Sequence, residues 1–197
     1  MKKITALILA LVLALGAAAF ADTLPAFKPE AGEPDDPGYA IDLLLSDVER
    51  AKEDFSYEDG NVVIPAAIIY KITVLKGETS TYKVYGTFCT DIYRVNGDVL
   101  ERLAGITRQG MITLELSKDG KWTVIGEEYA QDETFEADQE RIAGGSADLL
   151  ARFRDREKNE RSYAAVRKAN IRQYVQDNGL DITAYQDYGW DPVPLDP

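Results

Sequence analysis

The sequence predicts an α+β fold in which an N-terminal helix packs on a curved five-stranded antiparallel meander, followed by C-terminal helices. Apolar residues recur at helical spacing over residues 41–55. From residue 62 to residue 128, β-branched and aromatic residues predominate and turn signals recur. Helical spacing returns after residue 146. One helix, a run of strands and further helices are the element order of an α+β domain.

Residues 1–21 have the three parts of a secretory signal peptide. Lys2 and Lys3 form the basic region, residues 4–15 form the apolar core, and residues 19–21, Ala-Phe-Ala, form the cleavage site. The apolar core is shorter than the roughly 20 residues that span a bilayer, which favours cleavage over a membrane anchor. We therefore expect a secreted or periplasmic protein that is soluble after cleavage and has no membrane span.

The rest of the chain divides into an arm and one domain. Residues 22–38 contain four prolines among acidic and small residues, a composition typical of a flexible arm. Residues 39–197 have the length of a single α+β domain, which ends in a helical and aromatic tail segment. Asp36 and Pro37 are typical of the N-cap and first position of a helix, which should extend to about Phe55.

Five strands are expected after this helix. Pro65 marks the first as an edge or bulged strand, and Asn96-Gly97 is the strongest hairpin signal. Gln109-Gly110 is interpreted as the turn between the third and fourth strands. Short turns require antiparallel neighbours, and such a sheet curls, so the preceding helix should fill its concave face. The expected strands span residues 62–75, 81–95, 99–107, 111–117 and 122–128.

Three helical stretches are expected beyond the sheet. Gly144-Gly145 ends one helical stretch, and Ser146 is a candidate N-cap for the next. The last helix is expected from about Glu160 to Asn178, with Gly179 as its C′ residue.

The amino-acid composition excludes several kinds of catalytic site and disfavours one class of partner. Asp and Glu number 34 against 22 Lys and Arg, so the net charge is −12, which disfavours nucleic acid as a partner. The absence of histidine excludes Ser-His-Asp catalysis and His-containing zinc sites, and no phosphate-binding glycine loop is present. Cys89, the one cysteine, has neither a disulfide partner nor a histidine base, so we interpret it as a half-buried strand residue. We assign no catalytic residue, cofactor or metal.

Acidic residues gather at residues 53–59 and 127–140. Such clusters can bind Ca²⁺ or perform general acid and base catalysis. The residue spacing of an EF-hand is missing, and sequence does not show that any two carboxylates converge. A solvated surface is the favoured interpretation.

The C-terminal segment carries the candidate contact residues. Tyr185, Tyr188 and Trp190 lie among Asp, Gln and Gly, a composition typical of a carbohydrate or peptide contact surface. The alternative is that these rings dock on the sheet and complete the core. We name the three as possible ligand or partner contacts.

Two short segments of the expected sheet resemble segments of known proteins. Residues 84–88, Val-Tyr-Gly-Thr-Phe, and residues 120–124, Gly-Lys-Trp-Thr-Val, resemble segments of small exported bacterial proteins of uncharacterised function. The element order over residues 37–130 resembles the cystatin-like and NTF2-like α+β folds. NTF2-like enzymes tend to place acidic or histidine groups inside their cone, and this chain has no histidine, so the resemblance implies binding over catalysis.

The sequence therefore favours a non-enzymatic binding domain. The expected partner is a protein or small ligand at the cell envelope or outside it, bound through the concave sheet or the aromatic tail. One alternative is a carboxylate-dependent glycan hydrolase, which needs a cleft with two carboxylates about 5 to 9.5 Å apart. The other is a self-associating structural envelope protein, which needs a self-complementary apolar patch and would form a homo-oligomer.

Overall fold

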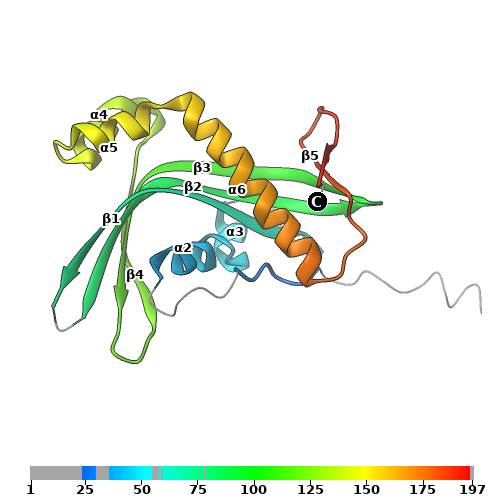
Figure 1. Ribbon diagram of the computed structural model, residues 1–197, viewed down its shortest axis with the longest axis horizontal. Coiled ribbons are helices and arrows are strands. Elements are labelled where there is room, and N and C mark those ends of the chain that lie inside the picture. The colour runs from blue at the N-terminus through cyan, green and yellow to red at the C-terminus, as the bar shows by residue number, and fades with distance from the viewer. Residues whose placement is uncertain (1–23, 30–35, 55–57, 59, 78, 196–197) are drawn as a thin grey trace, which may run out of the picture.

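The computed structural model describes residues 24–29, 36–54, 58, 60–77 and 79–195, so the expected signal peptide lies outside the described residues. The described chain has an α+β fold with a curled sheet (Figure 1). Its helices are α2 (Pro37–Leu45), α3 (Val48–Asp54), α4 (Phe135–Ala143), α5 (Ala147–Arg154), α6 (Arg156–Asp177) and the 3₁₀ turn η1 (Asp132–Thr134). Its strands are β1 (Val62–Lys76), β2 (Ser80–Asn96), β3 (Val99–Leu116), β4 (Trp122–Tyr129), β5 (Ala184–Gln186) and β6 (Val193–Pro194).

The sheet is mixed, whereas the sequence predicted a purely antiparallel meander. β1, β2 and β3 pair antiparallel in chain order, and β4 pairs antiparallel with one end of β3. At the other end of β3, β5 pairs with it in parallel, and β6 pairs with β5. The parallel pair forms because three helices separate β4 from β5 and return the chain along the sheet (Figure 1).

β3 is one long strand where the sequence predicted two strands joined by a turn at Gln109-Gly110. Gly110 adopts no positive φ. Instead, a Cβ at this position would collide with the carbonyl oxygen of Glu128 and would lie 2.9 Å from the Cα of Tyr129. The absence of a side chain at Gly110 therefore allows β4 to approach β3 closely. The glycine is required for this contact and not for a turn, which explains why the turn prediction was wrong.

Both faces of the sheet are covered by helices. We call the face that carries Val84, Phe88 and Ile112 the inner face, and it packs against α2. The outer face carries Cys89, Asp91 and Tyr93, and α4, α5 and α6 lie over it. The sheet bends over α2 and α3 (Figure 1). This coverage gives the alternating side chains of β2 a buried environment on either side.

The N-terminal helix expected to reach Phe55 is interrupted. Asp36 caps α2 as expected, since its carboxylate accepts a hydrogen bond of 2.8 Å from Gly38 N. The chain leaves the helix after Leu45, where the Ser46 hydroxyl donates to the carbonyl of Leu43 at 3.2 Å, and α3 follows. Ile41 and Leu45 are buried against the inner face, so this face is filled.

Part of the segment expected to be a flexible arm packs on the domain. Phe27 is 4% exposed and joins the core between α6 and the sheet. The Tyr174 hydroxyl donates to the carbonyl of Pro25 at 3.0 Å, and Gln173 donates to that of Lys28 at 3.1 Å. Burial of one aromatic ring stabilises this arrangement by about 2 kcal/mol.

The ends of the later helices follow the predicted signals. Ser146 caps α5 and accepts from Leu149 N at 3.3 Å, and Gly179 follows α6 with φ of +58°. α6 begins earlier than predicted because Asp155 caps it by accepting from Lys158 N at 3.1 Å. None of the described helices is long and apolar enough to cross a membrane.

Candidate functional site

A cavity of about 780 Å³ lies between the outer face of the sheet and the helices α4, α5 and α6. Cavities of roughly 300 to 1,000 Å³ are the size that binds small organic ligands. The aromatic rings that line it are Phe135, Phe153 and Tyr163. The lining residues from the sheet are Ile68, Thr87, Cys89, Thr107 and Gln109.

The floor of the cavity is formed by hydroxyl and thiol groups that already have partners. Thr87 Oγ1 lies 2.6 Å from the hydroxyl of Tyr70. Thr107 Oγ1 donates to Cys89 Sγ at 3.5 Å. Burial raises the pKa of the Cys89 thiol to about 11, so it remains protonated at neutral pH. The floor therefore presents an uncharged surface.

Two glutamines connect the helices to the sheet beside this floor. Gln139 of α4 is 3% exposed and donates to Gln109 Oε1 of β3 at 2.7 Å. Gln109 in turn donates through Nε2 to the carbonyl of Phe153 in α5 at 3.2 Å. The ring of Phe153 packs edge-to-face on Tyr70 with centroids 5.4 Å apart. These contacts hold α4 and α5 over the sheet and keep the cavity shape.

Charged residues line the exposed rim. Arg156 donates to Glu160 at 2.7 Å, and Arg154 donates to Glu140 at 2.8 Å. All four side chains are at least 42% exposed, so these ion pairs contribute little to stability. The cavity thus combines an uncharged floor, aromatic walls and a charged entrance.

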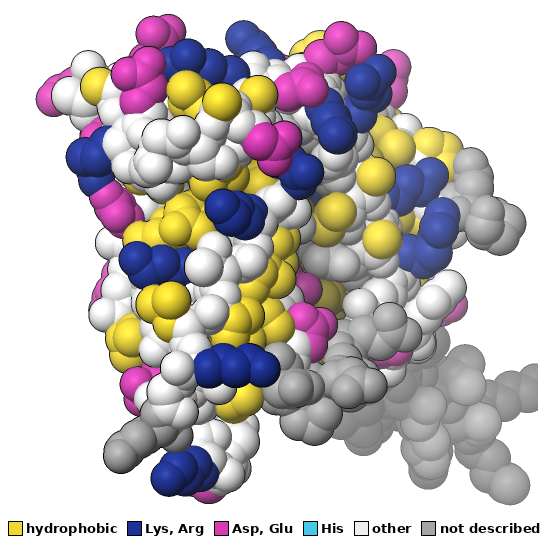
Figure 2. All heavy atoms as spheres, turned by 60° about the vertical axis from the view of Figure 1, so that its left-hand side comes forward, with side chains coloured by type: hydrophobic (Ala, Val, Ile, Leu, Met, Phe, Trp, Pro, Cys, Tyr) yellow, Lys and Arg dark blue, Asp and Glu magenta, His cyan; other side chains and the backbone are white. Residues whose placement is uncertain are grey.

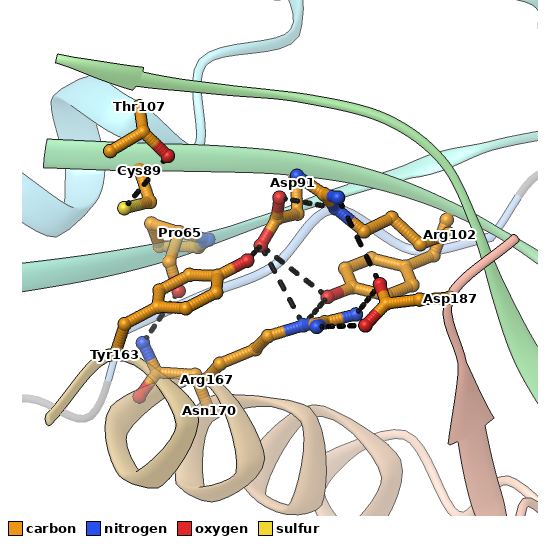
Figure 3. A network of polar contacts seen from close by, with 10 residues as sticks. Pro65, Cys89, Asp91, Arg102, Thr107, Tyr163, Arg167, Asn170 and Asp187 are labelled. Atoms are coloured by element: carbon orange, nitrogen blue, oxygen red, sulfur yellow. Dashed lines mark hydrogen bonds and ion pairs between the residues drawn. The ribbon is translucent and has the colours of Figure 1, made fainter. Parts of the chain in front are cut away.

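A buried network of charges adjoins the cavity (Figure 3). The Asp91 carboxylate, 1% exposed, accepts from Arg102 Nε at 2.7 Å and from the Tyr163 hydroxyl at 2.6 Å. Arg167, 6% exposed, donates through Nε to the Tyr93 hydroxyl at 2.5 Å. The same guanidinium donates to both carboxylate oxygens of Asp187. Among the described residues, no buried side-chain nitrogen or oxygen lacks a hydrogen-bond partner.

The network contains two aspartates and two arginines, so its charges balance. Hydrogen bonds from Arg167 lower the pKa of Asp187, which keeps its carboxylate ionised. Burial, followed by the charge of Asp91, raises the pKa of Tyr163, which therefore stays protonated and donates to Asp91. Since Tyr163 also lines the cavity, the network fixes the position of one cavity wall.

Gly105 makes room for this network. Gly105 lies opposite Asp91 in the β2–β3 ladder, and a Cβ on it would collide with the Arg102 guanidinium and the Asp91 carboxylate. A register shift beside Ile92 then pairs Tyr93 with Arg102. The shift places Arg102 on the outer face with Asp91 and Tyr93.

The structure separates the three aromatic residues proposed from sequence as contacts. Tyr185 is 6% exposed and lies under Arg167, whose guanidinium carbon is 4.7 Å from the ring centroid. This ring completes the core, as the docking alternative expected. Tyr188 and Trp190 are 96% and 76% exposed, so they remain accessible and lie apart from the cavity lining.

Sequence analysis missed the cavity because its lining comes from β1, β2, β3, α4, α5 and α6. No local motif joins these elements. The one available signal was Cys89, which was correctly expected in a strand but as a half-buried residue, whereas the structure buries it fully.

A second apolar surface lies outside the cavity. Figure 2 shows hydrophobic side chains gathered into a band on the face below α4 and α5, with Lys and Arg side chains along it. Large apolar side chains at the far end of the sheet are at least 36% exposed, namely Ile72, Val74, Leu75, Val124 and Ile125. Any test of ligand binding has to distinguish this surface from the cavity.

The described residues contain no group of three or more Cys, Asp or Glu side chains able to hold a metal ion. No family model, no curated protein and no solved structure matches the chain.

Proposed function

We propose that the protein is an exported, non-enzymatic binding domain that takes a ligand with a large apolar part into the outer-face cavity. The observation that carries this proposal is the cavity of about 780 Å³ with aromatic walls and an uncharged floor. Burial of an apolar group there would contribute about 25 cal/mol per Å² of surface removed from water. The inner face, which with the aromatic tail was one of the two surfaces where binding was expected, carries α2 and α3, so the proposal concerns the opposite face.

The hydrolase alternative gains no support from this cavity. Its lining carboxylates are Glu136 and Glu160, and both are exposed. Glu160 is already paired with Arg156. A general acid is usually held in an apolar environment that the cavity rim does not provide.

The proposal is tested by titration with an apolar fluorescent probe, anilinonaphthalene sulfonate. We expect one saturable site per chain. Ile68→Trp places an indole in the cavity and should weaken binding at least tenfold. Ile72→Trp is the matched control, because it makes the same change on the same strand outside the cavity lining. Equal binding to both variants would contradict the proposal.

A further inference from the structure

Among the described strands, none pairs with the edge of β3 between the segments that pair with β4 and β5, and we call this stretch the open edge. β4 pairs with β3 from Gly110 onward, and β5 pairs with it only as far as Glu101 (Figure 1). No described strand covers the stretch between them on this side of β3. Gly105 and Thr107 in this stretch are both exposed. The open edge extends for roughly 20 Å at the usual rise of an extended strand.

The backbone of this stretch directs hydrogen-bonding groups outward. Ala130 N donates to the carbonyl of Gln109 at 2.9 Å, so the backbone groups of Gln109 point away from β2. Alternate residues of an antiparallel ladder point the same way. Thr107 and Gly105 therefore present N–H and C=O groups to the open side. An added strand would satisfy these groups.

Cavities lie on both sides of the open edge and share Thr107. The outer-face cavity lies on one side. On the inner side, a polar cleft of about 660 Å³ is lined by Thr107, Arg108 and α3 residues. Side chains of an added strand alternate between the two faces of a sheet. Successive side chains of one extended peptide would thus enter the apolar cavity and the polar cleft in turn.

Charges in the polar cleft favour a basic side chain. Arg50 is paired with Glu127 at 2.7 Å, and Arg108 lies over the ring of Tyr129. Glu53 and Asp132 also line the cleft, and neither forms an ion pair with another described residue. The net charge of −12 adds a long-range attraction for a basic partner.

We infer that the open edge of β3 binds an extended peptide by strand addition, with apolar side chains in the outer cavity and basic side chains in the polar cleft. This inference rests on the proposed function, since it names a peptide as the ligand whose apolar side chains fill that cavity.

The test begins with selection of random displayed heptapeptides on the full chain. We expect selected sequences that alternate apolar with basic residues. Thr107→Pro removes an outward N–H at the edge and should weaken binding of a selected peptide at least tenfold. Val74→Pro in the opposite edge strand β1 is the control and should leave binding unchanged. N-methylation of alternate peptide amides should weaken binding to the unaltered protein by a similar factor, which needs no variant to fold.

Three results would overturn the inference. These are selection of no peptide, equal binding of a selected peptide to Thr107→Pro, and a concentration-dependent dimer that Thr107→Pro abolishes. The last would assign the edge to a second copy of the chain. The probe titration with the Ile68 and Ile72 variants is independent of these results, so strand addition can fail while the cavity proposal stands.

Discussion

Arg167 and Asp187 are joined by two parallel hydrogen bonds, 2.8 and 2.7 Å long. Arg167 lies in the middle of α6, and Asp187 directly follows β5. The pair therefore attaches the C-terminal segment to the helix that covers the outer face. Arg102 lies 3.9 Å from the same carboxylate, which connects this attachment to Asp91 in the sheet. A bidentate arginine–carboxylate pair of this kind is stronger than an ion pair joined by one hydrogen bond.

Asp187→Asn should lower the free energy of unfolding by about 1–2 kcal/mol at pH 7, because Arg167 loses the carboxylate that it bonds twice and keeps only the more distant Asp91, 3.7 Å away, as a charged partner. The folded-state pKa of Asp187 is lowered, so this stabilisation is present above the unfolded-state pKa and is lost as pH falls through the folded-state value. Urea unfolding from pH 7 to pH 3 measures it. The exposed Asp191→Asn is the control, and equal stability of both variants at pH 7 would contradict the account.

The contribution of Asp42 to stability should depend on pH in the opposite direction to that of Asp187. Burial, and then the charge of Asp36, raises its pKa to about 6, so the ionised form destabilises the folded state above this pH. Asp42→Asn should raise the free energy of unfolding at pH 8 by about 1–2 kcal/mol. The gain should disappear below about pH 4, where Asp42 is protonated in both states. A gain that persists at pH 3.5 would exclude this cause.

Gly105→Ala should lower the stability of the folded protein strongly for so small a substitution. The added methyl displaces Arg102 from Asp91 and leaves a buried carboxylate with fewer partners. We expect a loss of about 2–4 kcal/mol in unfolding free energy. Gly126→Ala in β4 is the matched control, since its Cβ would meet only ordinary contacts at 3.8 Å or more. Thermal unfolding of the two variants measures both losses. A similar small loss of unfolding free energy in both would contradict the stabilising role of the network.

Cys89 should be unreactive in the folded protein. Its thiol is buried, and burial raises its pKa to about 11. Thiolate reagents at pH 8 should react with it about 100-fold more slowly than with the chain in guanidinium chloride. Ellman's reagent measures both rates. A folded-state rate close to the unfolded-state rate would mean that the cavity floor is open to solvent and ionisable.

Local signals predicted the elements well and their assembly less well. Asp36, Pro37, Ser146 and Gly179 marked helix ends correctly because capping depends on neighbouring residues. Gly110 misled the prediction, since a glycine that admits a close strand has the same sequence signature as one in a turn. The parallel pairing of β5 depends on where α6 returns the chain, which no local pattern encodes.

The candidate site was largely beyond sequence reasoning. The cavity depends on contacts such as Gln139 to Gln109, thirty positions apart, and the network joins Asp91 to Tyr163, seventy-two positions apart. Composition did identify the aromatic tail, of which Tyr185 is buried and Tyr188 and Trp190 are exposed. Whether an aromatic ring is buried depends on tertiary packing. The residue types alone therefore did not show which of these three rings is buried and which are exposed.

The most direct test of the central claim is where an apolar probe binds. Isotope-filtered nuclear Overhauser measurements on the complex with anilinonaphthalene sulfonate would locate it. The account predicts cross-peaks from the probe to the methyl groups of Ile68 and to the rings of Phe135 and Phe153. Cross-peaks only to Ile72, Val74 and Leu75 would place the probe on the exposed end of the sheet and contradict a ligand site in the cavity.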